Sequence, residues 1–199
     1  MLFNELNDEQ KKAAIEEHRD WNVGYPWWKP TYEYCKEVAL KIGLHIDEIQ
    51  FSGFWNQGDG ARFRGWYVWQ QTNEALPERI EEIQEVLTRQ AMLCAIHTHG
   101  AKPQIIIAFD RNSHYCHERT MEIDGLCITA PIAHDVAMRI LPEEVEEEII
   151  KLLDDEAMEE AMRSFAKWIY RELEKEYEYL TSDEAVAEAL IVNEVEFTF

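Results

Sequence analysis

Basic residues are scarce in this chain, which has 19 lysines and arginines against 40 aspartates and glutamates and a formal net charge of -21 at pH 7. A charge of that sign repels nucleic acid and anionic membrane, and it favours a basic partner. Much of the acidity lies late in the chain, where residues 141–199 hold 19 acidic and five basic side chains. The composition therefore predicts a protein partner and no direct binding of nucleic acid.

Long apolar runs are also missing. No stretch approaches the length of apolar residues that spans a bilayer. Residues 1–5 lack the basic and apolar parts of a secretory signal. We therefore expect a cytoplasmic protein without a membrane partner.

Cysteine is sparse and widely spaced. The four residues are Cys35, Cys94, Cys116 and Cys127, and no two of them form a C-x-x-C pair. Such spacing indicates neither a disulfide framework nor a redox motif. Free thiols in a reducing cytosol are the expectation.

Patterns for nucleophilic catalysis are lacking as well. Ser52 has no nucleophile-elbow glycines around it, and no cysteine has a histidine partner in the sequence. The chain is therefore predicted not to be an enzyme, and no cofactor is predicted.

Histidines offer one alternative, because predicted neighbouring strands could bring together His97, His99, His114 and His117 with Cys94, Cys116 and Asp110. Two histidines that alternate on a strand share a face and could hold zinc. No spacing matches a strong zinc signature, so the prediction is no metal and a solvated sheet face. An enzyme with a zinc site at His97, His99 and His117 stays an alternative.

Apolar residues make up 46% of the chain and aromatic residues 12%, including seven tryptophans, which predicts a folded protein. Without repeats or low-complexity linkers, a single domain over residues 1–199 is expected. It would comprise N-terminal helices over 1–45, a sheet region over 48–130 and an acidic helical part over 131–199. The predicted fold class is α+β: an antiparallel sheet with an aromatic hairpin, packed by several helices including a long acidic C-terminal helical region.

Local patterns assign the helices. Asn7 is placed to cap a first helix, a tryptophan-rich loop over 21–30 is expected to pack on the core, and a second helix runs from Pro30 to Gly43. A third helix opens at Pro77, and a long helical region covers 141–180. Apolar side chains at helical spacing predict its buried face: Met158, Met162, Phe165, Ile169 and Leu173. Ser182 is placed to cap a short last helix.

Aromatic and branched runs over 49–55 and 63–69 flank an Asp-Gly pair, which predicts a β-hairpin. Residues 92–99, 104–109 and 115–123 are predicted as further antiparallel strands. The tail over 195–199 alternates like a strand or a docking arm. The sheet would therefore be built from the middle of the chain.

The hairpin turn over residues 51–60 is the strongest candidate site. Its glycines could present backbone amides and a carboxylate to a ligand, with Phe54 and Trp55 as a stacking surface. The alternative is a purely structural turn, since Asp-Gly is a standard hairpin signal. The predicted binding residues are Phe51, Ser52, Phe54, Trp55, Gln57, Gly58, Asp59, Gly60, Arg62 and Trp66.

The acidic run Glu143–Glu148 has two interpretations as well. It is either a solvated helix face or a mimic of a phosphate backbone.

Residues 51–60 and 168–184 resemble a family of small proteins encoded by phages, prophages and plasmids. Residues 115–118 and 121–124 are similar to its middle motif, and the resemblance covers nearly everything from Trp21 to the C-terminus. The chain departs from the pattern at Asn56, where a serine is usual, and at Arg62, where a small residue or cysteine is usual. Ligand contacts at those two positions are therefore in doubt.

The resemblance implies a mobile-element protein related to type V-A anti-CRISPR proteins. The expected function is anti-defence: the chain binds a host protein, such as a CRISPR effector or its nascent chain, in the host bacterial cytoplasm. One alternative is a module that sequesters a small nucleotide signal through the amides of Gly58 to Gly60, beside Arg62 and Arg64. A DNA-mimic protein is the other.

Overall fold

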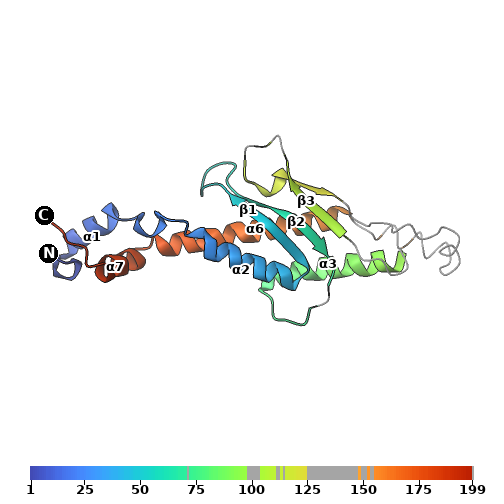
Figure 1. Ribbon diagram of the computed structural model, residues 1–199, viewed down its shortest axis with the longest axis horizontal. Helices are drawn as coiled ribbons and strands as arrows, with labels where there is room; N and C mark the ends of the chain where they lie inside the picture. The colour runs from blue at the N-terminus through green and yellow to red at the C-terminus, as the bar shows by residue number, and fades with distance from the viewer. Residues whose placement is uncertain are drawn as a thin grey trace. The chain divides into compact units, whose positions relative to one another are not determined.

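The computed structural model describes residues 1–70, 72–97, 104–110, 113, 115–124, 148, 152 and 155–198. These residues form five α-helices, three short 3-10 helices and one four-stranded antiparallel sheet (Figure 1). The helices are α1 (Asp8–Glu17), α2 (Trp28–Lys41), α3 (Glu78–His97), α6 (Asp155–Leu180) and α7 (Asp183–Val192). The strands are β1 (Leu44–Phe51), β2 (Ala61–Val68), β3 (Gln104–Phe109) and β4 (Met121–Asp124). The predicted α+β class is confirmed.

The described residues divide into two compact units. One comprises residues 1–33 and 171–199, and the other comprises residues 34–170. The expected single domain over 1–199 stays a prediction. Of the expected acidic helical part, most of residues 131–154 lie outside the described residues, including nearly all of the run 143–148.

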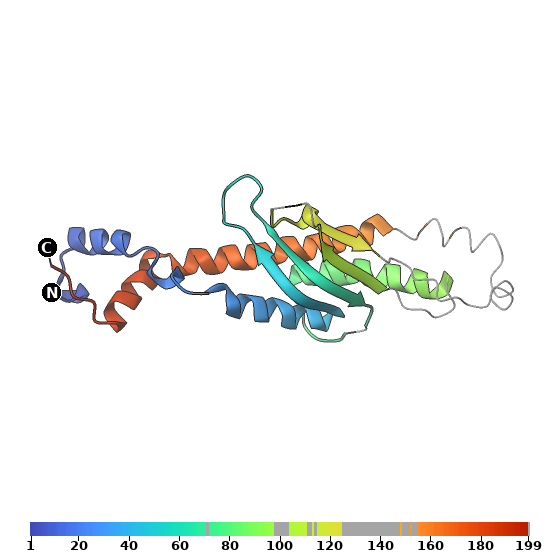
Figure 2. The same cartoon turned by 45° about the horizontal axis from the view of Figure 1, so that its top comes forward.

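The sheet belongs to the unit over 34–170 and has the order β1-β2-β3-β4. Leu44 pairs with Tyr67 and Phe51 with Ala61, so β1 and β2 form the predicted hairpin. Figures 1 and 2 both draw α6 behind this sheet, and the Phe63 and Phe165 rings meet edge to face at 5.8 Å. All five residues predicted for the buried face of α6 are buried, from Met158 to Leu173. One face of the sheet therefore forms the core.

The unit over 1–33 and 171–199 has a core of its own, made by Phe3, Leu6, Ala14, Val186, Leu190 and Phe197. The predicted caps are confirmed, since the Asn7 side chain accepts a hydrogen bond from Gln10 N and the Ser182 side chain accepts one from Ala185 N. The tail docks as expected: Phe197 N donates to Met1 O at 2.8 Å, and the Met1 ammonium donates to Phe197 O at 3.0 Å. Both ends of the chain thus close this unit.

The strand predicted over 92–99 is wrong in its described part, because α3 continues to His97. The buried set Ile80, Ile83, Leu87, Ala91 and Cys94 follows helical spacing without a break. His97 therefore lies on a helix, and His99 lies outside the described residues.

The strand predicted over 115–123 is wrong in its first half. Residues 118–120 form a 3-10 helix, which the His117 side chain caps by accepting from Arg119 N, and only 121–124 form β4. The hairpin strands also differ in extent, since β1 begins at Leu44 and ends at Phe51. Residues 52–60 are a loop.

The cysteine expectation is partly wrong. Cys35 and Cys116 carry thiols, whereas Cys94 is disulfide-bonded. Wide spacing in sequence does not restrict distance in the fold, so it could not exclude a bond at Cys94.

Candidate functional site

The loop over residues 52–60, called the hairpin loop below, joins β1 to β2. Its ends are tied by Ser52: the Ser52 amide donates to Gly60 O at 3.1 Å, and the Gly60 amide donates to Ser52 Oγ at 3.2 Å. The Ser52 hydroxyl donates onward to Cys116 O at 3.4 Å. Ser52 therefore fixes the base of the loop.

A tight turn forms the tip of the hairpin loop. Asp59 accepts a hydrogen bond from Asn56 N at 2.9 Å through Oδ2, and the Asp59 amide donates to Asn56 O at 3.1 Å. Gly58 adopts a φ of 92°, which glycine tolerates without steric cost. The amides of Asp59 and Gly60 thus donate within the loop. Fewer backbone amides remain that could bind a small nucleotide.

Phe54 anchors the loop and is not an open stacking surface, because only 8% of the residue is exposed. Its ring packs against Tyr170 of α6 at a centroid distance of 5.4 Å and against Phe51 at 5.7 Å. The Tyr170 hydroxyl donates to Gly53 O at 3.3 Å. The loop is therefore held onto α6 by packing and by a hydrogen bond.

Trp55 differs from Phe54 in its exposure to solvent. It is 68% exposed and has a φ of 69°. A bulky residue at positive φ is a backbone outlier, and such outliers gather at functional sites. Gln57 is also exposed. The loop thus presents a large aromatic side chain from a fixed backbone.

Arg62 is buried and structural in its contacts, at 8% exposure. Its Nε and Nη2 donate to Gln50 Oε1 at 3.0 and 2.9 Å, and Nη1 donates to Thr120 Oγ1 at 3.3 Å. The guanidinium carbon lies 4.5 Å from the centroid of the Phe109 ring. Arg64 pairs with Glu48 at 3.0 Å. The basic pair predicted beside the turn is thus engaged within the sheet.

Trp66 lies far along the hairpin from Trp55, because it pairs with His45 near the start of β1. With about 3.3 Å of rise per residue, the six residue-to-residue steps from His45 to Phe51 span roughly 20 Å. Trp66 is 44% exposed and stacks on the His45 ring at 4.9 Å. The structure therefore separates the two predicted tryptophans.

Residues 115–120, called the bracing segment below, lie against the hairpin loop. The sequence predicted a strand here and placed Cys116 and His117 in the zinc alternative, but it did not predict contact with the hairpin loop. A Cβ atom at Gly60 would lie 3.1 Å from both Cys116 O and His117 Cδ2, so only glycine fits there easily. Glu118 is buried, with its carboxylate 2.9 Å from His117 Nδ1 and 3.8 Å from Lys167 Nζ. The segment thus supports the loop from one side.

No cluster of three or more histidine, cysteine, aspartate or glutamate side chains suited to a metal occurs among the described residues. His97 and His117 lie on a helix and in the bracing segment, not on paired strands. His99 and His114 lie outside the described residues. The predicted sharing of a strand face by His97 and His99 is therefore wrong.

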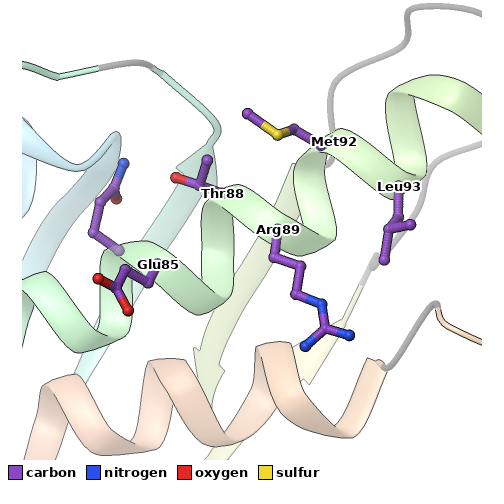
Figure 3. Close-up of a pocket in the computed structure, with 6 residues that line it drawn as sticks. Glu85, Thr88, Arg89, Met92 and Leu93 are labelled. Carbon is purple, nitrogen blue, oxygen red and sulfur yellow. The ribbon is translucent and has the colours of Figure 1, made fainter.

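A hollow of about 440 Å³ is lined by residues of α3: Gln84, Glu85, Thr88, Arg89, Met92 and Leu93. Figure 3 shows Arg89 pointing toward α6 and Met92 pointing away from it. A second, of about 310 Å³, lies between α3 and α6.

None of the described helices combines the length and the apolar character needed to cross a membrane.

Comparisons with known proteins yield a family. No curated protein matches the chain, and no solved structure matches it. A family model described as a domain of unknown function matches residues 27–183. This match covers all of the sheet, the hairpin loop and α6, and the chain belongs to the DUF8835 family.

Proposed function

We propose that the chain is an anti-defence protein of a mobile element that binds a basic protein of the bacterial host through the hairpin loop. The observation that carries the proposal is Trp55, a tryptophan 68% exposed at positive φ on a braced loop. Tryptophan is enriched among residues that dominate binding energy. Exposure of such a ring in water, on a strained backbone, is costly unless a partner covers it.

Charge supports a basic partner. The net charge of -21 creates a negative field that accelerates encounters with basic proteins and discourages nucleic acid. The aromatic side chain would supply affinity, while the field would supply rate and selectivity.

The mobile-element context rests on the motifs over 51–60, 115–124 and 168–184, which resemble those of phage and plasmid proteins. A CRISPR effector of type V-A, folded or nascent, is the partner that this resemblance proposes. The host cytoplasm is the corresponding location.

Capture from bacterial lysate at low salt tests the proposal. Wild-type chain, Trp55→Ala and the control Tyr25→Ala are compared, because Tyr25 is 56% exposed but lies outside the hairpin loop. We expect wild type and the control to retain the same basic protein, and Trp55→Ala to lose it by roughly tenfold or more. Equal capture by all three, or no captured protein at low salt, would contradict the proposal.

The anti-defence part has a separate test in cells that carry a type V-A CRISPR system. Expression of the wild-type chain should raise the survival of a targeted plasmid, and Trp55→Ala should not. If the survival of the targeted plasmid does not change although the chain still captures a basic protein, the proposed binding function stands and a type V-A effector is not its target.

A further inference from the structure

Tyr115, in the bracing segment, is a second exposed ring beside the hairpin loop. It is 66% exposed. A Cβ atom at Gly58 would lie 3.4 Å from Tyr115 Cδ1 and 3.6 Å from Cε1, so the ring lies over this glycine. Gly58 belongs to the same short loop as Trp55. Two large exposed aromatic side chains from distant segments therefore lie at the same short loop.

The backbone under both rings is fixed by hydrogen bonds. The Tyr115 amide donates to Ser113 Oγ at 3.2 Å, and the Thr120 hydroxyl donates to Tyr115 O at 3.0 Å. Ser52 links the two segments through Cys116 O. Aromatic side chains have few rotatable bonds, so their immobilisation on binding costs little entropy. The surface is preorganised for a partner.

We infer that Trp55 and Tyr115 together form a recognition surface for arginine side chains of a partner protein. The inference rests on the proposed function and specifies the chemistry that the partner presents.

Arginine is the group that this chemistry favours. A guanidinium stacks flat on aromatic faces and is less strongly hydrated than an ammonium group. The fold already contains such contacts, since the Arg62 and Arg64 guanidinium carbons lie 4.5 and 5.9 Å from the Phe109 centroid. The excess of carboxylates brings cations to the surface, where exposed rings then discriminate among them.

The test uses a short labelled peptide of alternating arginine and glycine, with a lysine and glycine peptide beside it. Fluorescence anisotropy compares wild type with Trp55→Ala, Tyr115→Ala, Tyr115→Phe and the control Tyr25→Ala. None of these substitutions changes the charge of the chain, so general electrostatic attraction is the same in all. Thermal unfolding confirms that each variant is folded.

Both alanine variants at the surface should weaken binding of the arginine peptide by roughly 3- to 30-fold, the range for a lost cation–π contact. Tyr115→Phe keeps the ring and should bind within about twofold of wild type, as should Tyr25→Ala. The lysine peptide should bind more weakly than the arginine peptide.

Tight binding by Tyr115→Ala with a loss only in Trp55→Ala would overturn the shared surface and leave the proposed function intact. Equal binding by all variants would show attraction by charge alone and overturn the inference, as would a preference for lysine or no binding by wild type. The proposed function is judged separately, by capture from lysate.

Discussion

Tyr67 shows how a single buried group connects stability to pH. It is fully buried on β2, and its hydroxyl has no hydrogen-bond partner within the described part of the chain. Burial raises the pKa of Tyr67 above its ordinary value near 10, because the phenolate loses its hydration. The neutral form is therefore the one that the folded state accepts.

Tyr67→Phe should make the protein more stable. An unpartnered buried hydroxyl costs about 1 to 3 kcal/mol, so we expect the free energy of unfolding at neutral pH to rise by about 1 kcal/mol. Because the folded pKa is the higher one, the wild type keeps its full stability below about pH 10 and loses it as the unfolded chain ionises above that pH. The advantage of the variant should therefore grow in alkali.

Urea unfolding at neutral pH and above about pH 10 measures both effects. Tyr115→Phe is the control, since its exposed ring should change neither value. A variant less stable than wild type at neutral pH would show that the Tyr67 hydroxyl does have a partner.

The sequence could predict that aromatic residues surround the turn, but not which of them are exposed. Phe54 and Trp55 are neighbours of the same chemical type in an irregular loop, where no periodicity assigns a face. The burial of Phe54 arises in part from Tyr170, which is distant in sequence and packs on the Phe54 ring. Tyr115 was missed for the same reason.

At the level of elements, the helix caps and the buried face of α6 were predictable because their sequence signals are local. Asn7 and Ser182 each act within three residues, and the buried side of α6 repeats every three or four. The C-terminal end of α3 was not predictable in this way, because the run over 92–97 is short and apolar and suits a strand as well as a helix. The helical spacing of apolar residues continues from Ile80 to Cys94, and this continuity would have indicated a helix.

Removal of the α7 cap gives an element-scale prediction. Ser182→Ala deletes the acceptor of the Ala185 amide, at 3.2 Å, and should lower the free energy of unfolding by about 1 kcal/mol. Ser182→Asp retains an acceptor and adds a charge favourable to the helix dipole, so it should stay within about 0.5 kcal/mol of wild type. Urea unfolding followed by circular dichroism checks the pair. Equal losses in both variants would assign the effect to packing of Ser182 and not to capping.

For the whole molecule, the division into two units was hidden from the sequence. Helices α2 and α6 each contribute residues to both units, so no linker of distinct composition marks a boundary. The family match leaves out residues 1–26 and 184–199, which belong to the unit that contains both chain ends. Whether that unit unfolds independently is a question of cooperativity.

The substitution Phe197→Ala tests whether the unit that contains both chain ends unfolds independently. Phe197 is buried in the core of the unit over 1–33 and 171–199, and its ring packs on Phe3 and His18 at centroid distances of 6.3 and 5.6 Å. Loss of a buried phenylalanine costs about 3 kcal/mol or more, through lost contacts and the cavity that remains. We expect hydrogen exchange to quicken by roughly a hundredfold at protected amides of α1 and α7, with little change in β2 and β3.

Ile105→Val on β3 is the matched control, since it removes one buried methyl group from the other unit at a cost of about 1 kcal/mol. It should affect amides of the sheet and spare those of α1 and α7. If either substitution instead quickens exchange equally throughout, the continuous helices α2 and α6 couple the units into one cooperative domain, as the sequence alone had predicted.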